Sequence, residues 1–342
     1  MPPLGHGVPT VRHVIEFDAA EGQRFARDVV VAMGGSAADA RCVAELLVRA
    51  EVGGHPSHGL RRLPQYARGW RNGTIVPSAR PEIVRDDGST LILDGRRALG
   101  QAVCTQATDL AADRAFAHGV AAVAVRHSGH AGRFADYADR ACEKGAALLA
   151  FANDSGANQA VAPPGGLEGR LSTNPLAAGV PRTKPPHFVI DLATSVAAQG
   201  KVRVLQDAGR PVPEAWVRDG LLQPLGGAKG FALALLVEAL AGVVSGAGAV
   251  GPDPGPDDQG IFLLAFDLAR FGDPAELAGR VDAMLAHVLT APVQDGAEPL
   301  RAPGSALPPL PLDPEARFEL APAVLERVTA LGSELGVAAP SK

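Results

Sequence analysis

Apolar and polar residues recur with a helical period over the first part of the chain. Apolar positions follow this spacing over Ala19–Met33 and again over residues 37–51. Ser36 is a favourable N-cap for the second segment, and Gly53-Gly54 is a stop signal after it. The pattern therefore predicts two helices near the N-terminus, with a glycine-rich loop following the second.

The middle of the chain alternates strand-like and helix-like patterns. Residues 82–94 (EIVRDDGSTLILD) predict a hairpin that turns at Asp87-Gly88. Strands are expected over 120–127, 146–154, 187–193 and 261–268, and helices over 101–118, 134–144, 231–244 and 274–289. This alternation is typical of an α/β sheet.

Three further expectations concern the connections and the end of the chain. A helix is expected to begin at Thr194-Ser195, directly after a strand. Residues 248–260 (GAVGPDPGPDDQG) are too rich in Gly and Pro for regular structure and predict an irregular, mobile loop. A final helix is expected over residues 314–335.

Composition and charge restrict the class of protein. The 342 residues are 46% hydrophobic and 20% charged, as in a globular protein, and the net charge of −5 gives no support for nucleic-acid binding. No apolar signal segment occurs in residues 1–17, and the apolar stretch 231–244 is too short to span a membrane. Three widely spaced cysteines predict buried thiols. A cytoplasmic protein is expected.

Familiar nucleotide and metal motifs are absent. The sequence has no G-x-G-x-x-G after a strand, no P-loop and no H-E-x-x-H. A nucleotide would therefore bind without the usual phosphate turn, and no catalytic metal is expected.

The stretch GGHPSHGLRRLPQY (53–66) combines groups suited to acid–base chemistry. His58 titrates near neutral pH, Ser57 is placed to orient its ring, and Arg62 is suited to a bidentate carboxylate contact. The alternative is a loop whose histidines only bond to the exposed carbonyls of the helix end. Taken alone, the stretch favours that alternative slightly.

Other polar segments have a similar ambiguity. RHSGHAGR (126–133) contains His130 at a strand-to-helix turn, and STNP (172–175) contains Thr173 in a turn with free polar groups. DLATS (191–195) lies at a strand end, and PLGGAKG (224–230) is a glycine-rich loop suited to a phosphate or carboxylate. Each is equally compatible with a structural turn.

Six motifs in this order resemble the malate/L-lactate/L-sulfolactate dehydrogenase family. They are SHGLRRLPQY, GHAGR, STNPLAAGVP, DLATS, LGGAKG and APGS, and the resemblance extends from about residue 19 to about residue 330. This family is NAD(P)-dependent, is unrelated to Rossmann-type lactate dehydrogenases, and includes ureidoglycolate dehydrogenase and reductases of cyclic imines. Together the six motifs are far more specific than any one of them.

The resemblance implies a fold and an assembly. It implies a homodimer with a non-Rossmann cofactor-binding α/β domain and a helical domain built from both chain termini. The corresponding boundaries are 1–80 for an N-terminal helical, dimerisation and substrate segment, 81–300 for the NAD(P)-binding domain, and 301–342 for a segment that returns to the helical domain.

The resemblance also implies roles for individual residues. His58 would be the proton donor and acceptor beside Ser57, Arg62 would bind the substrate carboxylate, and Thr173 would contact the substrate. His130 would lie at the nicotinamide and the reacting carbon, and we favour His58 over it as the proton-transfer group. The cofactor, NAD or NADP, would also contact Asp191, Leu192, Ala193, Thr194, Ser195, Lys229, Gly230 and Gly304.

The predicted function is interconversion of a small 2-oxo acid and its L-2-hydroxy acid. Relatives that reduce imines tend to carry an acid ten residues after Asp191, where this chain has Lys201, which favours an oxo acid over a cyclic imine such as piperideine-2-carboxylate. Residues 218–223 form a shorter segment than relatives usually have, and Ser305 replaces a glutamate of the family. A homologue that binds ligand without turnover is the alternative of another class.

Overall fold

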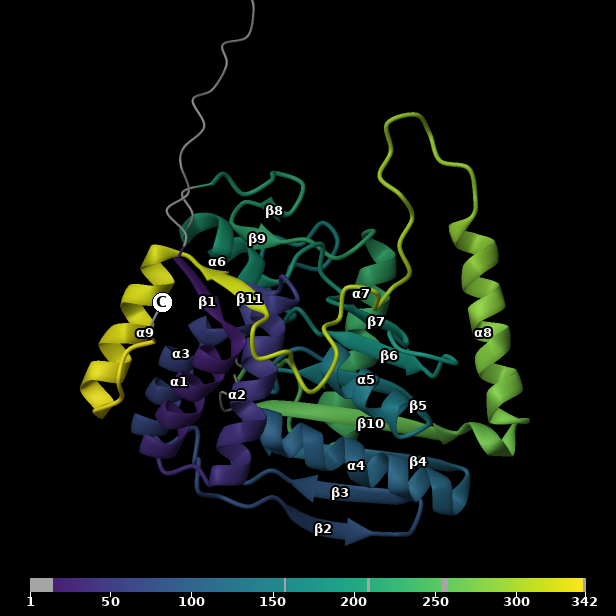
Figure 1. Cartoon of the computed structure of the whole chain (residues 1–342), viewed down its shortest axis with the longest axis horizontal. Helices are drawn as coiled ribbons and strands as arrows, with labels where there is room; N and C mark the ends of the chain where they lie inside the picture. The colour runs from purple at the N-terminus through teal and green to yellow at the C-terminus, as the bar shows by residue number, and fades with distance from the viewer. Residues whose placement is uncertain (1–14, 157, 208–209, 254–257, 341–342) are drawn as a thin grey trace, which may run out of the picture.

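The computed structural model describes residues 15–156, 158–207, 210–253 and 258–340. Within this part of the chain, Figure 1 shows a group of helices beside a twisted sheet, with one long helix standing away from the body. Two sequence predictions fall partly outside the described residues. They concern residues 1–14, within the segment where no signal sequence was found, and residues 254–257 of the predicted loop.

The central sheet is mixed. Its strands follow the order β2 (Glu82–Asp86), β3 (Thr90–Asp94), β4 (Val120–Ser128), β10 (Gln259–Asp267), β5 (Ala146–Asn153), β6 (Leu176–Val180) and β7 (Phe188–Leu192). Only β3 and β4 run parallel, and each other neighbouring pair is antiparallel. Since a Rossmann sheet is parallel, the predicted non-Rossmann α/β fold is confirmed.

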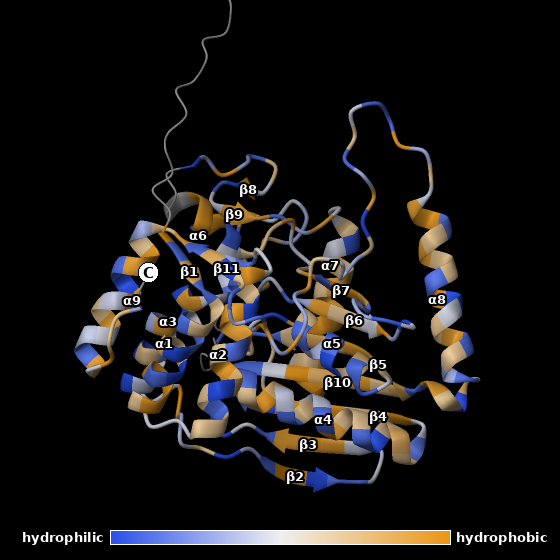
Figure 2. Cartoon of the chain, in the orientation of Figure 1, coloured by the Kyte–Doolittle hydropathy of each residue, from blue (hydrophilic) through white to orange (hydrophobic). Residues whose placement is uncertain are grey.

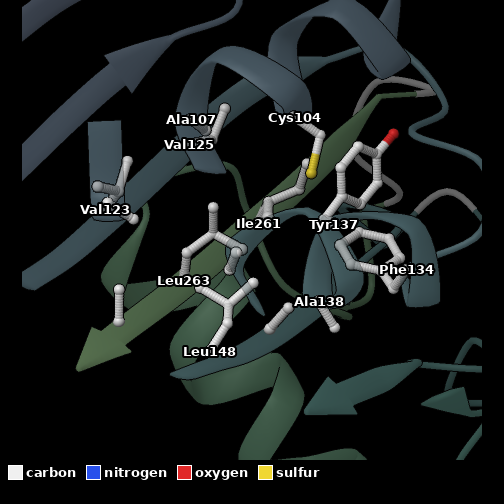
Figure 3. Packing of buried hydrophobic residues seen from close by; sticks show 14 of the residues in the cluster. Cys104, Ala107, Val123, Val125, Phe134, Tyr137, Ala138, Leu148, Ile261 and Leu263 are labelled. Carbon is white, nitrogen blue, oxygen red and sulfur yellow. The ribbon is translucent and has the colours of Figure 1, made fainter. Parts of the chain in front are cut away.

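The late strand β10 pairs on both sides, with β4 and β5, and so occupies the middle of the sheet. Helices α4 (Gly100–His118) and α5 (Ala135–Glu143) pack on it and its neighbours. Figure 3 shows Ile261 and Leu263 of β10 beneath Cys104 of α4 and Tyr137 of α5. The inward face of α4 is mostly alanine, so this helix can approach the sheet closely.

A second core joins the two ends of the chain. Its helices are α1 (Ala19–Ala32), α2 (Ala37–Val52), α3 (Leu63–Arg71) and α9 (Pro322–Leu335). Strand β1 (Ile15–Asp18) pairs antiparallel with β11 (Arg317–Leu320), and the purple and yellow ribbons lie side by side in Figure 1. The helical layer is thus built from both chain termini, while the three domain boundaries stay a prediction.

A buried charge cluster ties the helical layer to the sheet. Arg49 of α2 bonds Asp136 at 3.0 Å and Asp139 at 2.5 Å, and its Nε donates to the carbonyl of Pro308 at 2.8 Å. Arg133 adds two hydrogen bonds to Asp136. Removing one partner would leave a buried charge uncompensated, so this cluster holds α2 and α5 in one relative position.

The remaining elements lie at the margins of these two cores. They are α6 (Gln199–Asp207), β8 (Val217–Arg218), β9 (Leu221–Leu222), α7 (Ala228–Val237) with a π-helical continuation (Glu238–Val244), a 3-10 turn (Leu268–Arg270) and α8 (Pro274–Leu289). Figure 2 shows many apolar residues on α8 although it stands apart. No helix in the described ranges has the length and apolarity needed to cross a bilayer. Of the cysteines expected to be buried, Cys104 and Cys142 are, whereas Cys42 is half-buried, and all three are free.

Three expected elements differ from the structure. The helix expected from Thr194-Ser195 is wrong, because Thr194 bonds to Thr173 and Ser195 bridges to Pro224, so α6 begins only at Gln199. The helix expected over 314–335 begins at Pro322, since its first residues pair with β1 instead. In the loop expected over 248–260, β10 already begins at Gln259.

Candidate active site

A cavity of about 610 Å³ lies between the helical layer and the sheet. It collects five of the residues predicted to act on substrate, which are Ser57, His58, Arg62, His130 and Thr173. Its wall also contains residues that the sequence did not single out as functional, among them Gln65, Arg68, Asp154, Arg203, Asp258 and Gln259. The residues for substrate chemistry therefore share one space.

The loop that carries Ser57 and His58 is shaped by Glu51, at the end of α2. Its Oε1 atom accepts a hydrogen bond of 2.8 Å from the amide of Leu60. A Cβ at Gly59 would lie 2.1 Å from the same oxygen, so glycine is required where the carboxyl group passes. Burial raises the pKa of Glu51 to about 8, against a lowering by this amide and by Arg61. The loop then continues as two short 3-10 turns, Pro56–His58 and Leu60–Arg62.

The His58 imidazole is neutral at physiological pH in this environment. Burial, followed by the charges of Arg62 and Arg133, lowers its pKa to about 3. The Ser57 hydroxyl lies 2.9 Å from Nδ1. A hydroxyl both donates and accepts, so Ser57 can keep this bond whether Nδ1 carries a proton or a lone pair. His58 is therefore able to change protonation state without losing its partner.

Arg62 is held from two sides and keeps donors for a ligand. Its Nε donates to the carbonyl of Ser57 at 2.7 Å and its Nη1 to Gln65 Oε1 at 2.7 Å. Among the described residues, Nη2 takes no protein hydrogen bond. It faces Gly200 of α6, where a Cβ would lie only 3.3 Å away. An oriented guanidinium with free N–H groups is suited to a carboxylate.

His130 follows β4 and lies beside His58, with ring centroids 5.9 Å apart and planes inclined by 20°. Its Nδ1 is 3.0 Å from the hydroxyl of Tyr66, which in turn accepts a hydrogen bond of 2.6 Å from Gln101 Nε2. Tyr66 lies four residues after Arg62. If the segment is assumed to be helical, this spacing places the two side chains on the same face of the helix. Gln101, in the first turn of α4, carried no comparable sequence signal.

The opposite wall of the cavity is fixed by hydrogen bonds among polar side chains. Asp154, directly after β5, accepts from Ser172 Oγ at 2.6 Å and from Gln259 Nε2 at 2.9 Å. Gln259 Oε1 accepts from the amide of Ala131, beside His130, at 2.8 Å. Thr173, next to Ser172, reaches the cavity from this side. Asp154 is thus an oriented carboxylate in the wall, although the sequence did not single it out.

The predicted cofactor residues, apart from His130, do not line this cavity. Asp191–Ser195 lie at and just after the end of β7 and are joined to the loop before α7, since the Thr194 carbonyl accepts from the amide of Leu225 at 2.9 Å. Asp191 accepts from the amide of Ala135 at 2.8 Å, and Thr194 donates both its amide and its hydroxyl to the carbonyl of Thr173. Gly304, with φ +86°, packs against β7, where a Cβ would lie 2.8 Å from the carbonyl oxygen of His187.

The start of α7 has the donor groups that a cofactor phosphate requires. Gly226 and Gly227 have φ values of +59° and +63°, and a Cβ at either would meet nothing within 4 Å. No side chain caps the helix. The amides of Gly227 and Gly230 are bonded to protein carbonyls, whereas those of Ala228 and Lys229, both exposed, take part in no such bond among the described residues. Exposed amides, a helix N-terminus and a lysine fit an anionic phosphate group. The turn is therefore suited to an anionic group such as a phosphate.

Four residues discussed from the sequence have structural contacts. His55 bonds the carbonyl of Gly53 at 2.8 Å, and His127 bonds Asp94. Arg61 is half-buried in the cavity wall. Lys201 lies over the ring of Trp216, 5.2 Å from its centroid, and does not line the cavity.

Comparison with known proteins identifies the family of the chain. Residues 17–307 match the model of a family described as malate/L-lactate dehydrogenase. An L-lactate dehydrogenase of Cupriavidus necator is 32% identical over 96% of this chain and 100% of its own length. The structure of malate dehydrogenase from Pyrococcus horikoshii superimposes with a TM-score of 0.85 and 26% identity, covering 99% of this chain and 100% of that one. A Δ1-piperideine-2-carboxylate reductase structure from Pseudomonas syringae has a TM-score of 0.76 and 26% identity, covering 93% and 99%. The chain therefore belongs to the malate/L-lactate dehydrogenase family, and it is an oxidoreductase of the 2-hydroxy-acid dehydrogenase type.

Proposed function

We propose that this protein is an NAD(P)-dependent oxidoreductase that interconverts a small 2-oxo acid and its L-2-hydroxy acid. One observation carries the proposal: Ser57-His58 and Arg62 share a cavity with His130 and Thr173, which come from distant parts of the chain. Reduction of an oxo acid requires a carboxylate clamp, a proton donor at the developing alkoxide and an oriented hydride donor. The first two groups are side chains of this cavity.

Arg62 binds the substrate carboxylate in this proposal. Two of its N–H groups are used by Ser57 and Gln65, which fixes the guanidinium plane. Thr173 contacts the substrate from the opposite wall. The oxo group then lies near the two imidazoles, and His58 gives its proton to the oxygen as that oxygen acquires negative charge. In the reverse direction, neutral His58 takes the proton from the hydroxyl group.

Binding of the substrate also prepares His58 for this step. The low pKa of His58 arises from burial and then from the nearby positive charge of Arg62. A substrate carboxylate paired with Arg62 offsets that charge, which raises the pKa of His58 and favours its protonated form. The acid needed for reduction is thus formed most readily when the substrate is in place.

NAD or NADP, when bound, supplies or accepts the hydride. The segment Asp191–Ser195, the Lys229-Gly230 turn and Gly304 hold it in this proposal, with the exposed start of α7 and Lys229 placed for a phosphate. The segment 218–223 lies next to this region, and its shortness affects cofactor affinity more than the acid–base groups.

The test is oxidation of NADH and NADPH by pyruvate, oxaloacetate and sulfopyruvate, with and without the His58→Ala substitution. We expect turnover of at least one oxo acid and its loss in the variant. No turnover with any oxo acid contradicts the proposal, as does equal turnover by the variant.

A cyclic-imine reductase is the second candidate, because a structural neighbour is named a piperideine-2-carboxylate reductase. Lys201 stands where relatives that reduce imines tend to carry an acid, and it lies over Trp216 without lining the cavity, which favours the oxo acid. Assay of Δ1-piperideine-2-carboxylate beside the oxo acids separates the two candidates. If neither class turns over and no cofactor shifts the melting temperature, a non-catalytic binding protein is the better description.

We also propose that the protein is a homodimer, with α8 in the interface. Phe271, Met284 and Val288 are 64%, 49% and 56% exposed on and beside this helix, and an apolar recess of about 350 Å³ lies beneath it. Exposed apolar area of this kind is typical of an interface. Met284→Lys with Val288→Lys is expected to yield a monomer in light scattering, whereas an unchanged mass removes α8 from the interface.

A further inference from the structure

Two buried side chains behind His130 are not used by the proposed reaction. Tyr66 of α3 and Gln101 of α4 are each only 1% exposed. Gln101 Nε2 lies 2.6 Å from the Tyr66 hydroxyl, and that hydroxyl lies 3.0 Å from His130 Nδ1. Gln101, Tyr66 and His130 are thus linked by a chain of two hydrogen bonds from the first turn of α4 to the cavity wall.

The direction of each hydrogen bond follows from the groups involved. An amide nitrogen only donates, so the Tyr66 oxygen accepts from Gln101. The single hydroxyl hydrogen of Tyr66 is then free to point at His130 Nδ1, which must accept with its lone pair. Burial raises the pKa of Tyr66 to about 12, so the tyrosine keeps this hydrogen throughout the neutral range.

The His130 ring carries a single hydrogen on its two nitrogens. Burial, followed by the charges of Arg62 and His58, lowers its pKa well below the ordinary value, so the ring is neutral. Since Nδ1 accepts from Tyr66, the hydrogen must lie on Nε2. Among the described residues Nε2 has no protein partner, so this N–H group is available to a ligand.

With the opposite polarity, Nδ1–H would donate to Tyr66, and the buried Tyr66 hydrogen would lose its one acceptor among the described residues unless the Gln101 amide also turned over. Its Oε1 atom is buried and has no partner among the described residues. Turning the amide would place Oε1 against Tyr66 and leave the NH2 group, with its two donors, in that unpartnered position. Buried donors without a partner are rarer than under-satisfied acceptors, so the observed direction is the favoured one.

His58, the neighbouring ring, has a different kind of partner. The Ser57 hydroxyl can rotate and so can serve either state of Nδ1. Protonation of His130, in contrast, would place a hydrogen on Nδ1 opposite the Tyr66 hydrogen. It could proceed only if the Tyr66 hydrogen turned away from its one acceptor among the described residues, or if the Gln101 amide turned over as well. The two rings therefore differ in what they can do, although they stack side by side.

We propose that Tyr66 and Gln101 are positioning residues that hold His130 as the neutral tautomer with its hydrogen on Nε2. His130 then donates a hydrogen bond to the substrate oxygen, and His58 alone transfers the proton. This proposal rests on the proposed function for the identity of that oxygen, whereas the tautomer itself is a property of the protein without substrate.

The experiment is nitrogen NMR of the full-length protein labelled with 15N-histidine, with the His130 signals assigned by their absence in His130→Asn. In the unsubstituted protein we expect a neutral ring with hydrogen on Nε2 at pH 7. A hydrogen on Nδ1, or a charged ring, overturns the proposal.

Two variants test whether Tyr66 and Gln101 cause this state. Tyr66→Phe removes both hydrogen bonds that the Tyr66 hydroxyl makes, and Gln101→Met removes only the one from Gln101. Either variant is expected to give a mixture of tautomers. Tyr137→Phe is the matched control, since it removes another buried tyrosine hydroxyl, one bonded to the Ala131 carbonyl, and should leave the tautomer unchanged. If Tyr66→Phe and Gln101→Met both keep hydrogen on Nε2, neither residue sets the tautomer.

Kinetics supply a second measurement. With a substrate from the oxo-acid panel, Tyr66→Phe is expected to lower kcat about tenfold and to change KM by less than about twofold, because the lost alignment matters in the transition state. A rise in KM with unchanged kcat overturns the positioning role. Absence of all turnover by the unsubstituted enzyme contradicts the proposed function instead, and the NMR result still decides the tautomer.

Discussion

The cavity around His58 and the turn around Lys229 hold their polar groups in different ways. In the cavity, buried side chains fix one another, as Ser57 and Gln65 do for Arg62. At the start of α7 the groups suited to a ligand are the exposed backbone amides of the first turn, which follow two glycines of positive φ, with the exposed side chain of Lys229 beside them. The substrate side thus depends on side-chain chemistry, whereas the cofactor side depends on backbone shape. Substitutions of side chains should therefore impair the substrate side most, and substitutions of glycine should impair the cofactor side most.

Removal of the His58 imidazole is expected to have the largest effect. His58→Ala should lower kcat for oxo-acid reduction on the order of 10³-fold, because a positioned general acid contributes this much. Cofactor affinity, measured by fluorescence titration, should change little. His118→Ala, an exposed histidine at the end of α4, is the control. A loss of less than about tenfold would assign the proton to another group.

A methyl group at Gly230 should damage the cofactor side through the backbone. Its Cβ would lie 2.4 Å from the carbonyl oxygen of Leu225 and 2.5 Å from that of Thr194. Gly230→Ala is therefore expected to lower the free energy of unfolding by about 1–3 kcal/mol and to weaken cofactor binding.

Gly279→Ala provides the matched control for this glycine. It adds the same group in α8, where nothing lies within 4 Å, and should stabilise by about 0.5–1 kcal/mol. Both variants are measured by urea denaturation. Equal stability of the two would show that the turn at Gly230 can relax.

The buried carboxyl group of Glu51 should make the substrate-side loop sensitive to pH. Its pKa is raised from 4.5 to about 8, so the folded protein binds this proton more tightly than the unfolded chain. The resulting stabilisation is complete below pH 4.5. It is lost as the pH rises towards 8, by up to about 1.4 kcal/mol per pH unit.

Glu51→Gln should therefore lose less stability than the unsubstituted protein between pH 5 and pH 8. Glu326→Gln, an exposed residue of α9, should follow the unsubstituted protein. Melting temperatures across this range check the expectation. Parallel curves for all three proteins would mean that folding does not raise the pKa of Glu51.

Loss of the exposed lysine should have the smallest effect. Lys229→Ala removes one charge from a helix N-terminus open to solvent, which is worth about 0.3–1 kcal/mol. The dissociation constant of NAD(P)H should rise about twofold to fivefold, with kcat nearly unchanged. Lys184→Ala is the exposed control. A loss of kcat in Lys229→Ala would place this lysine at the reacting groups.

Sequence reasoning succeeded where local signals determine the structure. The cap at Ser36, the stop at Gly53-Gly54 and the turn at Asp87-Gly88 gave elements close to those observed. The strand pair β1–β11 was missed because each strand has four residues and its partner lies about 300 residues away. Pairings of that range leave no periodic signal in either segment.

The site shows the same division. Ser57, His58 and Arg62 were found because they lie within one quoted stretch, and Tyr66 ends that stretch. Gln101 acts only through Tyr66, so its place depends on how α3 packs against the start of α4. Asp154 depends on the meeting of β5 with Ser172 and Gln259. Such contacts arise from tertiary packing and could not be predicted from the spacing of residues along the sequence.

The pH dependence of kcat/KM in both directions tests the central claim most directly. With a pKa of about 3, free His58 is almost entirely neutral above pH 5. Oxidation of the hydroxy acid, which needs the neutral base, should therefore be flat from pH 5 to 8. Reduction of the oxo acid, which needs the acid form, should fall about tenfold per pH unit over the same range. A reduction rate independent of pH, or a slope that persists in His58→Ala, would contradict the claim that His58 transfers the proton.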